Sequence, residues 1–76
     1  MVTIGVDLHK RVSQIAVLTA EGEGSQYRVD SAPEQMTEFF GRIPAPASVA
    51  IEASGTWWWL VDLLERLGHH PVLSHP

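Results

Sequence analysis

Two carboxylates with similar surroundings are the residues of this sequence best suited to chemistry. Asp7 follows an apolar run in the stretch IGVDLHK, and Glu52 follows the apolar run VAI. Two carboxylates that are brought together repel each other unless a cation lies between them. Mg²⁺ is commonly held by one or two carboxylates together with phosphate oxygens of a substrate. Asp7 taken alone is better explained as a turn residue, so the prediction of a metal site depends on the pair.

The positions of the two carboxylates depend on five predicted strands. Runs rich in β-branched residues, or alternating between apolar and polar residues, predict strands over residues 2–7, 12–19, 25–31, 48–52 and 70–74. Short turns join the first three strands into an antiparallel meander, and a right-handed crossover places the fifth strand beyond the fourth. The expected mixed sheet has the order 3-2-1-4-5. Its first and fourth strands would then be parallel neighbours about 4.8 Å apart, with Asp7 and Glu52 at the same edge.

Two helices are predicted between the later strands. Ser31 and Glu34 form a capping-box pattern with Pro33 in the first turn, and Gly41 ends this first helix. Thr56 is the predicted N-cap of the second helix. One face of that helix carries the apolar side chains of Trp57, Leu60, Val61, Leu64 and Leu67. The complete order is therefore βββαβαβ, an α/β fold.

The composition narrows the class of protein. The chain has 76 residues, of which 45% are hydrophobic and 18% are charged, and its net charge is −4. This composition is that of a globular domain. Only five residues are Lys or Arg, which argues against a domain that grips nucleic acid unaided. The chain has no cysteine and no apolar run near the roughly 18 residues of a membrane span, so we expect a soluble, cytoplasmic protein.

The strings IGVDLHK, VAIEASGTWWWLVDLLERLG and VLSHP, together with the element order, resemble a known family. The order is RNase H-like, with an acidic residue closing the first and fourth strands. The strings are similar to the N-terminal part of the DEDD-type insertion-sequence transposases, which are RuvC-like and related to the Piv DNA invertase. The resemblance covers nearly all of the chain and is weakest over residues 21–47.

The resemblance implies an activity and a set of ligands. Members cut and rejoin DNA strands with two Mg²⁺ ions, which Mn²⁺ can replace, held by four acidic residues. Asp7 and Glu52 match the first two of these catalytic, metal-binding residues. The matching aspartates for the other two, and the domain with the nucleophilic serine, have no counterpart in residues 1–76. We therefore expect an incomplete N-terminal portion of a RuvC-like catalytic domain, truncated after the fifth strand and inactive alone. DNA, a structured guide RNA and further copies of the full-length protein are the implied partners.

Three further residues are predicted to contact nucleic acid. Lys10 lies in the loop after Asp7, within reach of a DNA phosphate. Ser54 and Gly55 form the turn before the second helix, whose first N–H groups would approach a phosphate. An exposed loop position for Lys10 and an ordinary turn for the other two residues are equally good interpretations.

The run Trp57–Trp59 suggests base stacking, but helical geometry limits this interpretation. Successive helical residues point about 100° apart, so Trp57 is expected in the core and Trp58 and Trp59 outside it. Contact with other parts of a larger protein, or self-association of this chain, accounts better for two outward tryptophans.

Two other functions remain open from the residues alone. Actin-like and sugar-kinase-like ATPases begin with the same order of elements and an early aspartate. Their first hairpin, however, needs small residues that let the backbone approach phosphate, whereas this hairpin carries Leu8, His9, Lys10 and Arg11. The third interpretation is a non-catalytic interaction module derived from a transposase, which binds a partner through its tryptophan-rich helix.

Overall fold

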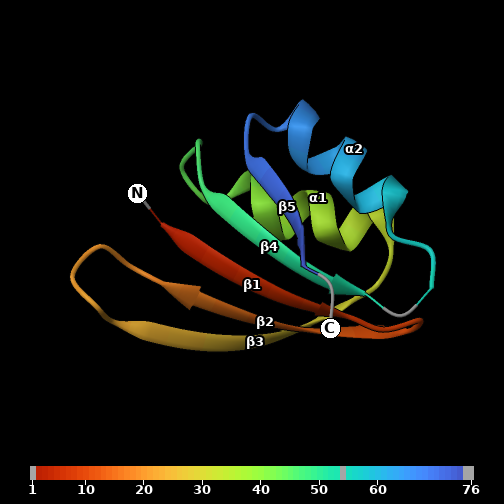
Figure 1. Ribbon diagram of the computed structural model, residues 1–76, viewed down its shortest axis with the longest axis horizontal. Coiled ribbons are helices and arrows are strands. Elements are labelled where there is room, and N and C mark those ends of the chain that lie inside the picture. The colour runs from red at the N-terminus through yellow and green to blue at the C-terminus, as the bar shows by residue number, and fades with distance from the viewer. Residues whose placement is uncertain (1, 54, 75–76) are drawn as a thin grey trace.

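The computed structural model describes residues 2–53 and 55–74 and shows the predicted order of elements (Figure 1). No strand boundary differs from the predicted one by more than one residue. The elements are β1 (Thr3–Leu8), β2 (Val12–Leu18), β3 (Gly24–Asp30), α1 (Pro33–Gly41), β4 (Ser48–Ala53), α2 (Trp58–Arg66) and β5 (His70–Ser74).

The five strands form one mixed sheet in the predicted order β3-β2-β1-β4-β5. β1 pairs with β2, and β2 with β3, in antiparallel fashion because short turns join them. β4 pairs in parallel with both β1 and β5, since a helix precedes β4 and another precedes β5. The carboxyl ends of β1, β4 and β5 therefore lie at one edge of the sheet (Figure 1).

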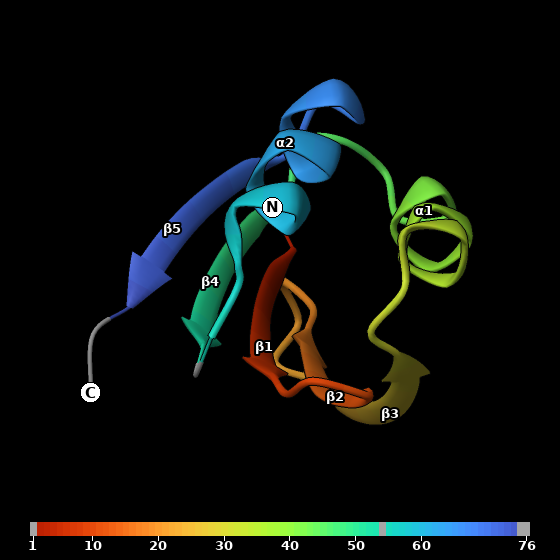
Figure 2. The same ribbon diagram turned by 90° about the vertical axis from the view of Figure 1, so that its right-hand side faces the viewer.

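The two faces of the sheet have different surroundings. Along β1, Ile4, Val6 and Leu8 are buried and the intervening residues are exposed, because successive strand residues point to opposite faces. Both helices pack on the face that carries the buried residues, and the opposite face is open (Figure 2). The core consists of Ile4, Val6, Leu8, Ile15, Met36, Phe40, Ala47, Val49, Ile51, Leu60 and Leu64.

The predicted capping box at the start of α1 is wrong. The N-cap residue is Ala32, and no side chain caps the helix. The hydroxyl of Ser31 instead lies 2.7 Å from the hydroxyl of Ser13, whose side chain is fully buried. A buried hydroxyl needs a hydrogen-bond partner, and Ser31 provides one for Ser13.

The predicted start of α2 is also wrong. The N-cap is Trp57 rather than Thr56, with φ −122° and ψ −18°, and no side chain caps the helix. These dihedral angles are not helical, so the Trp57 side chain leaves the apolar stripe and is 37% exposed. Trp59 packs against the core in its place, and its indole Nε1 donates a hydrogen bond to the carbonyl of Thr56 at 3.2 Å.

A buried histidine joins the end of α1 to the strand that follows it. His69 Nδ1 accepts a hydrogen bond from the backbone N–H of Ala47 at 3.0 Å. Nε2 therefore carries the proton, and it donates to the carbonyl of Phe40 at 3.0 Å. These two bonds connect the α2–β5 turn to α1 and to the start of β4.

Neither helix among the residues that the structure describes is long and apolar enough to cross a membrane.

Candidate functional site

Asp7 and Glu52 occupy directly paired positions on neighbouring parallel strands. Asp7 of β1 is the register partner of Glu52 of β4, at the usual strand spacing of about 4.8 Å. Both lie at exposed positions of their strands, so both belong to the open face of the sheet. The sequence suggested that each residue ends its strand. In the structure Leu8 follows Asp7 and Ala53 follows Glu52 as one more paired residue of each strand.

A row of polar residues crosses the sheet at the level of this pair. Gln14 is the partner of Asp7 in β2, and Ser74 is the partner of Glu52 in β5. Arg28 of β3 completes the row as the partner of Gln14. The carboxylates thus lie between uncharged hydrogen-bonding groups, with one guanidinium at the far edge of the sheet.

The next row on the same face has small residues at its centre, which leave a trough beside the carboxylates. Gly5 pairs with Ala16 on one side and with Ala50 on the other. These residues, with Asp7 and Glu52, line a hollow of about 320 Å³. A ligand can therefore approach both carboxylates from the open face.

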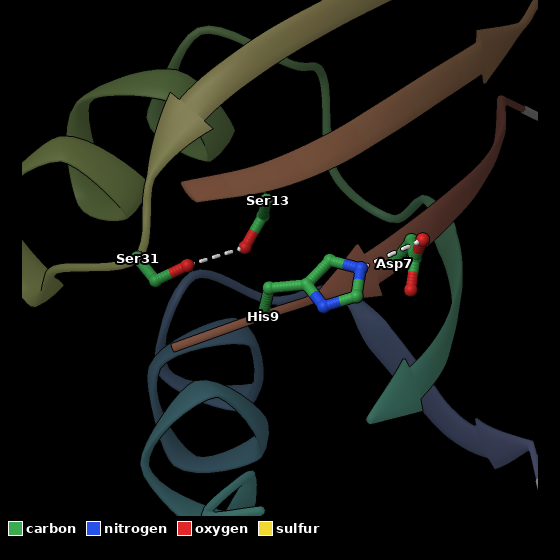
Figure 3. Close-up of polar contacts among 4 residues, drawn as sticks. All are labelled: Asp7, His9, Ser13 and Ser31. Carbon is green, nitrogen blue, oxygen red and sulfur yellow. Dashed lines mark hydrogen bonds and ion pairs between the residues drawn. The ribbon is translucent and has the colours of Figure 1, made fainter. Parts of the chain in front are cut away.

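His9 contacts the first carboxylate. Its Nε2 lies 3.1 Å from Asp7 Oδ2, and the two side chains are 56% and 54% exposed (Figure 3). The imidazole comes from the turn between β1 and β2. One oxygen of Asp7 is therefore engaged by His9.

The donor set of this site is two carboxylates. Within residues 2–53 and 55–74, no group of three or more His, Asp or Glu side chains is arranged to hold a metal ion. Two adjacent, exposed carboxylates nevertheless fit Mg²⁺, which usually keeps several waters and takes one or two carboxylates. The remaining ligands would be water and phosphate oxygens.

A second pocket brings together two of the three residues predicted to contact nucleic acid. Lys10 and Gly55 both line a cavity of about 220 Å³, hereafter the Lys10 pocket. Its other lining residues are Leu8, His9, Ser31, Thr56 and Trp59. Ser54, the third residue of the prediction, lies outside the described residues. The hydroxyls of Ser31 and Thr56 were not expected here, because their place depends on how three separate loops meet.

Comparisons with known proteins give no further identification, since no protein-family model and no curated protein matches this chain. The fold and the two pockets are therefore the structural basis for a functional proposal.

Proposed function

We propose that this chain is the N-terminal portion of an RNase H-like, RuvC-like catalytic domain from a DEDD-type insertion-sequence transposase. In this proposal Asp7 and Glu52 bind a Mg²⁺ ion used to cut and rejoin DNA strands. The observation that supports it most is the direct pairing of Asp7 with Glu52 on the open face of the sheet. The resemblance of the motif strings and the sheet order β3-β2-β1-β4-β5 agree with it.

The pairing of β1 with β4 favours the binding of one cation by both carboxylates. Because they are held side by side by backbone hydrogen bonds, they can bind one cation without a rearrangement of the chain. The trough floored by Gly5 and Ala16 leaves room for a DNA strand to bring a phosphate to the pair. A Mg²⁺ ion held by Asp7 and Glu52 would supply Lewis-acid activation of the phosphate.

The same proposal limits what residues 1–76 do alone. The family resemblance implies two further aspartates and a serine-bearing domain that these residues do not provide. We therefore expect metal binding but no strand cleavage by this chain. Lys10 and Gly55 are the proposed DNA contacts. Because the net charge is −4, the main contacts with DNA, or with a structured guide RNA, are proposed to lie in other parts of the assembly. That assembly is proposed to contain several copies of the protein.

Metal-dependent DNA binding tests the proposal. A fluorescent single-stranded oligonucleotide is titrated with the chain in Mn²⁺ and in EDTA, and its anisotropy is followed. The affinity is expected to be higher in Mn²⁺, because a bridging ion joins the carboxylates to phosphate. Asp7→Asn and Glu52→Gln should each remove this gain.

Matched variants separate a site from a general charge effect. Asp62→Asn and Glu65→Gln remove the same charges from exposed positions of α2. They should keep the full gain from Mn²⁺. An equal gain in all four variants, or no gain in the unmodified chain, would overturn the proposal.

An interaction module is the second candidate function, and one observation favours it. Trp58 is 60% exposed on α2, an unusual position for a large aromatic side chain without a partner. Such a module would bind its partner through this surface, and Asp7→Asn would leave the binding unchanged.

A further inference from the structure

We propose that the Lys10 pocket binds the phosphate of a nucleotide, with the sugar or base against Trp59. The proposal deepens the function proposed above and rests on it for one point, that the nucleotide belongs to a DNA strand. The pocket itself is argued below from its shape, charge and hydrogen-bond donors.

The pocket forms where three connections meet beyond the carboxyl end of β1. The β1–β2 turn supplies Lys10, the link between β3 and α1 supplies Ser31, and the β4–α2 loop supplies Gly55 and Thr56. Its volume of about 220 Å³ lies below the about 300 Å³ at which sites for drug-sized ligands begin. A phosphate with part of a nucleoside matches this size better than a larger ligand does.

The charge of the lining favours an anion. Lys10 brings an ammonium group, and none of the lining residues is acidic. The trough contains Asp7 and Glu52. A further hollow between β3 and α1 contains Asp30 and Glu38 together with Arg28 and Arg42. In a chain of net charge −4, a pocket with a lysine and no carboxylate selects for negative charge.

The buried hydroxyl of Ser13 can donate a hydrogen bond to Ser31, so that the Ser31 hydroxyl can donate to a ligand in the pocket. Ser13 is fully buried, and its Oγ lies 2.7 Å from Ser31 Oγ (Figure 3). When Ser13 donates to Ser31, the proton of Ser31 is free for a ligand. An anion in the pocket stabilises this direction of the bond over the reverse one. The backbone N–H of Ser31 donates to the carbonyl of Arg11 at 2.8 Å, which fixes the position of this residue.

The tryptophan that lines the pocket suits a nucleoside. The indole of Trp59 is held by its hydrogen bond to the carbonyl of Thr56 and is partly buried, so it presents a fixed aromatic surface. Aromatic surfaces of this kind stack on bases of any sequence. Gly55 has φ +112° and open space where a Cβ would be, so its backbone is accessible to a ligand.

His9 connects this pocket to the carboxylate pair. It lines the Lys10 pocket, and its Nε2 lies 3.1 Å from Asp7 Oδ2. A phosphate in the pocket would therefore lie next to the site of Asp7 and Glu52.

Nuclear magnetic resonance titrations in EDTA test the pocket without any metal. Thymidine 5′-monophosphate, inorganic phosphate and thymidine are added separately, and backbone amide shifts are followed. The nucleotide should shift amides of residues 8–11, 31 and 55–59 and bind more tightly than inorganic phosphate. Thymidine alone should bind more weakly than the nucleotide. Equal affinity for the nucleotide and inorganic phosphate, or shifts centred elsewhere, would overturn the proposal.

Variants assign the binding to the pocket. Lys10→Met should weaken nucleotide binding about tenfold, the usual effect of losing a charge-assisted hydrogen bond. Arg11→Gln removes the same charge one residue away, outside the pocket, and should change binding much less. Ser31→Ala should also weaken binding, whereas the exposed Ser25→Ala should not. Equal losses in Lys10→Met and Arg11→Gln would contradict a specific pocket.

Nucleotide binding in EDTA tests the Lys10 pocket separately from the metal site of Asp7 and Glu52. A chain that binds the nucleotide in EDTA but shows no gain from Mn²⁺ would keep the pocket and refute the proposed metal-dependent function.

Discussion

His9 Nε2 lies 3.1 Å from Asp7 Oδ2 at the carboxyl end of β1. The contact occupies one of the two carboxylate oxygens that Asp7 offers to a cation. Both side chains are more than half exposed, and pairs of this kind contribute about 0–1 kcal/mol. His9 is therefore a weak competitor of a metal ion at this site.

Removing His9 should strengthen metal binding slightly. In His9→Ala the carboxylate of Asp7 is free, so the dissociation constant for Mn²⁺ should fall by at most about fivefold, the equivalent of 1 kcal/mol. Isothermal titration calorimetry measures the change. Weaker binding in His9→Ala would instead show that the imidazole is a ligand of the ion.

Replacing His69 should lower the free energy of unfolding far more than replacing His70. Replacing His69 by alanine leaves the Ala47 N–H without its partner. It also removes one hydrogen bond from the Phe40 carbonyl, which keeps the one from the Ile43 N–H. The unsatisfied buried N–H costs about 1–3 kcal/mol and the lost hydrogen bond to Phe40 about 1 kcal/mol more, so His69→Ala should lose about 2–4 kcal/mol. Urea denaturation measures this loss. His70→Ala, at an exposed position of β5, is the control and should stay within about 0.5 kcal/mol of the unmodified chain.

The same substitution at two glycines should have opposite effects on stability. At Gly5 the space for a Cβ is open and φ is not positive, so Gly5→Ala should raise the free energy of unfolding by about 0.4–1 kcal/mol. Gly68 has φ +85°, and an added Cβ would lie 3.4 Å from the Cβ of Ala45. Gly68→Ala should lower the free energy of unfolding by about 1–2 kcal/mol. Thermal denaturation followed by circular dichroism distinguishes these signs, and a loss at Gly5 would contradict the open trough.

The chain should associate with itself through the exposed start of α2. Trp58 is 60% exposed and Trp57 beside it is 37% exposed, a patch that contact with another copy would remove from water. Sedimentation velocity should show a concentration-dependent increase in mass. Trp58→Gln should shift the transition to higher concentration, while Val72→Thr on the open face should not. A monomer at every concentration would refute the prediction.

The sheet and the placement of the carboxylates could be predicted from the sequence because both follow from local patterns. The alternation of buried Ile4 and Val6 with exposed Asp7 specifies the face of β1. The predicted order 3-2-1-4-5 has β4 beside β1, and the observed pairing brings Glu52 next to Asp7. The RNase H-like assignment adds a relationship to other proteins, and it stays a proposal.

The two wrong predictions concern the helix starts, where local sequence patterns were overridden by contacts with other parts of the fold. Ser31 fits a capping box, but the buried Ser13 is brought to it by the pairing of β2 with β3. Thr56 fits an N-cap, but α2 begins later and Trp59 replaces Trp57 against the core. The Lys10 pocket could not be predicted from local patterns either, because its lining comes from three connections far apart in the chain.

Paramagnetic broadening by Mn²⁺ tests the paired carboxylates most directly. Substoichiometric Mn²⁺ is added to the ¹⁵N-labelled chain, and the loss of backbone amide signals is mapped along the sequence. The account predicts weak binding with broadening centred on residues 7–10 and 52–55, abolished by Asp7→Asn and by Glu52→Gln and retained in Asp62→Asn. Broadening centred on Glu21 and Glu23, or on His69 and His70, would contradict a metal site formed by Asp7 and Glu52.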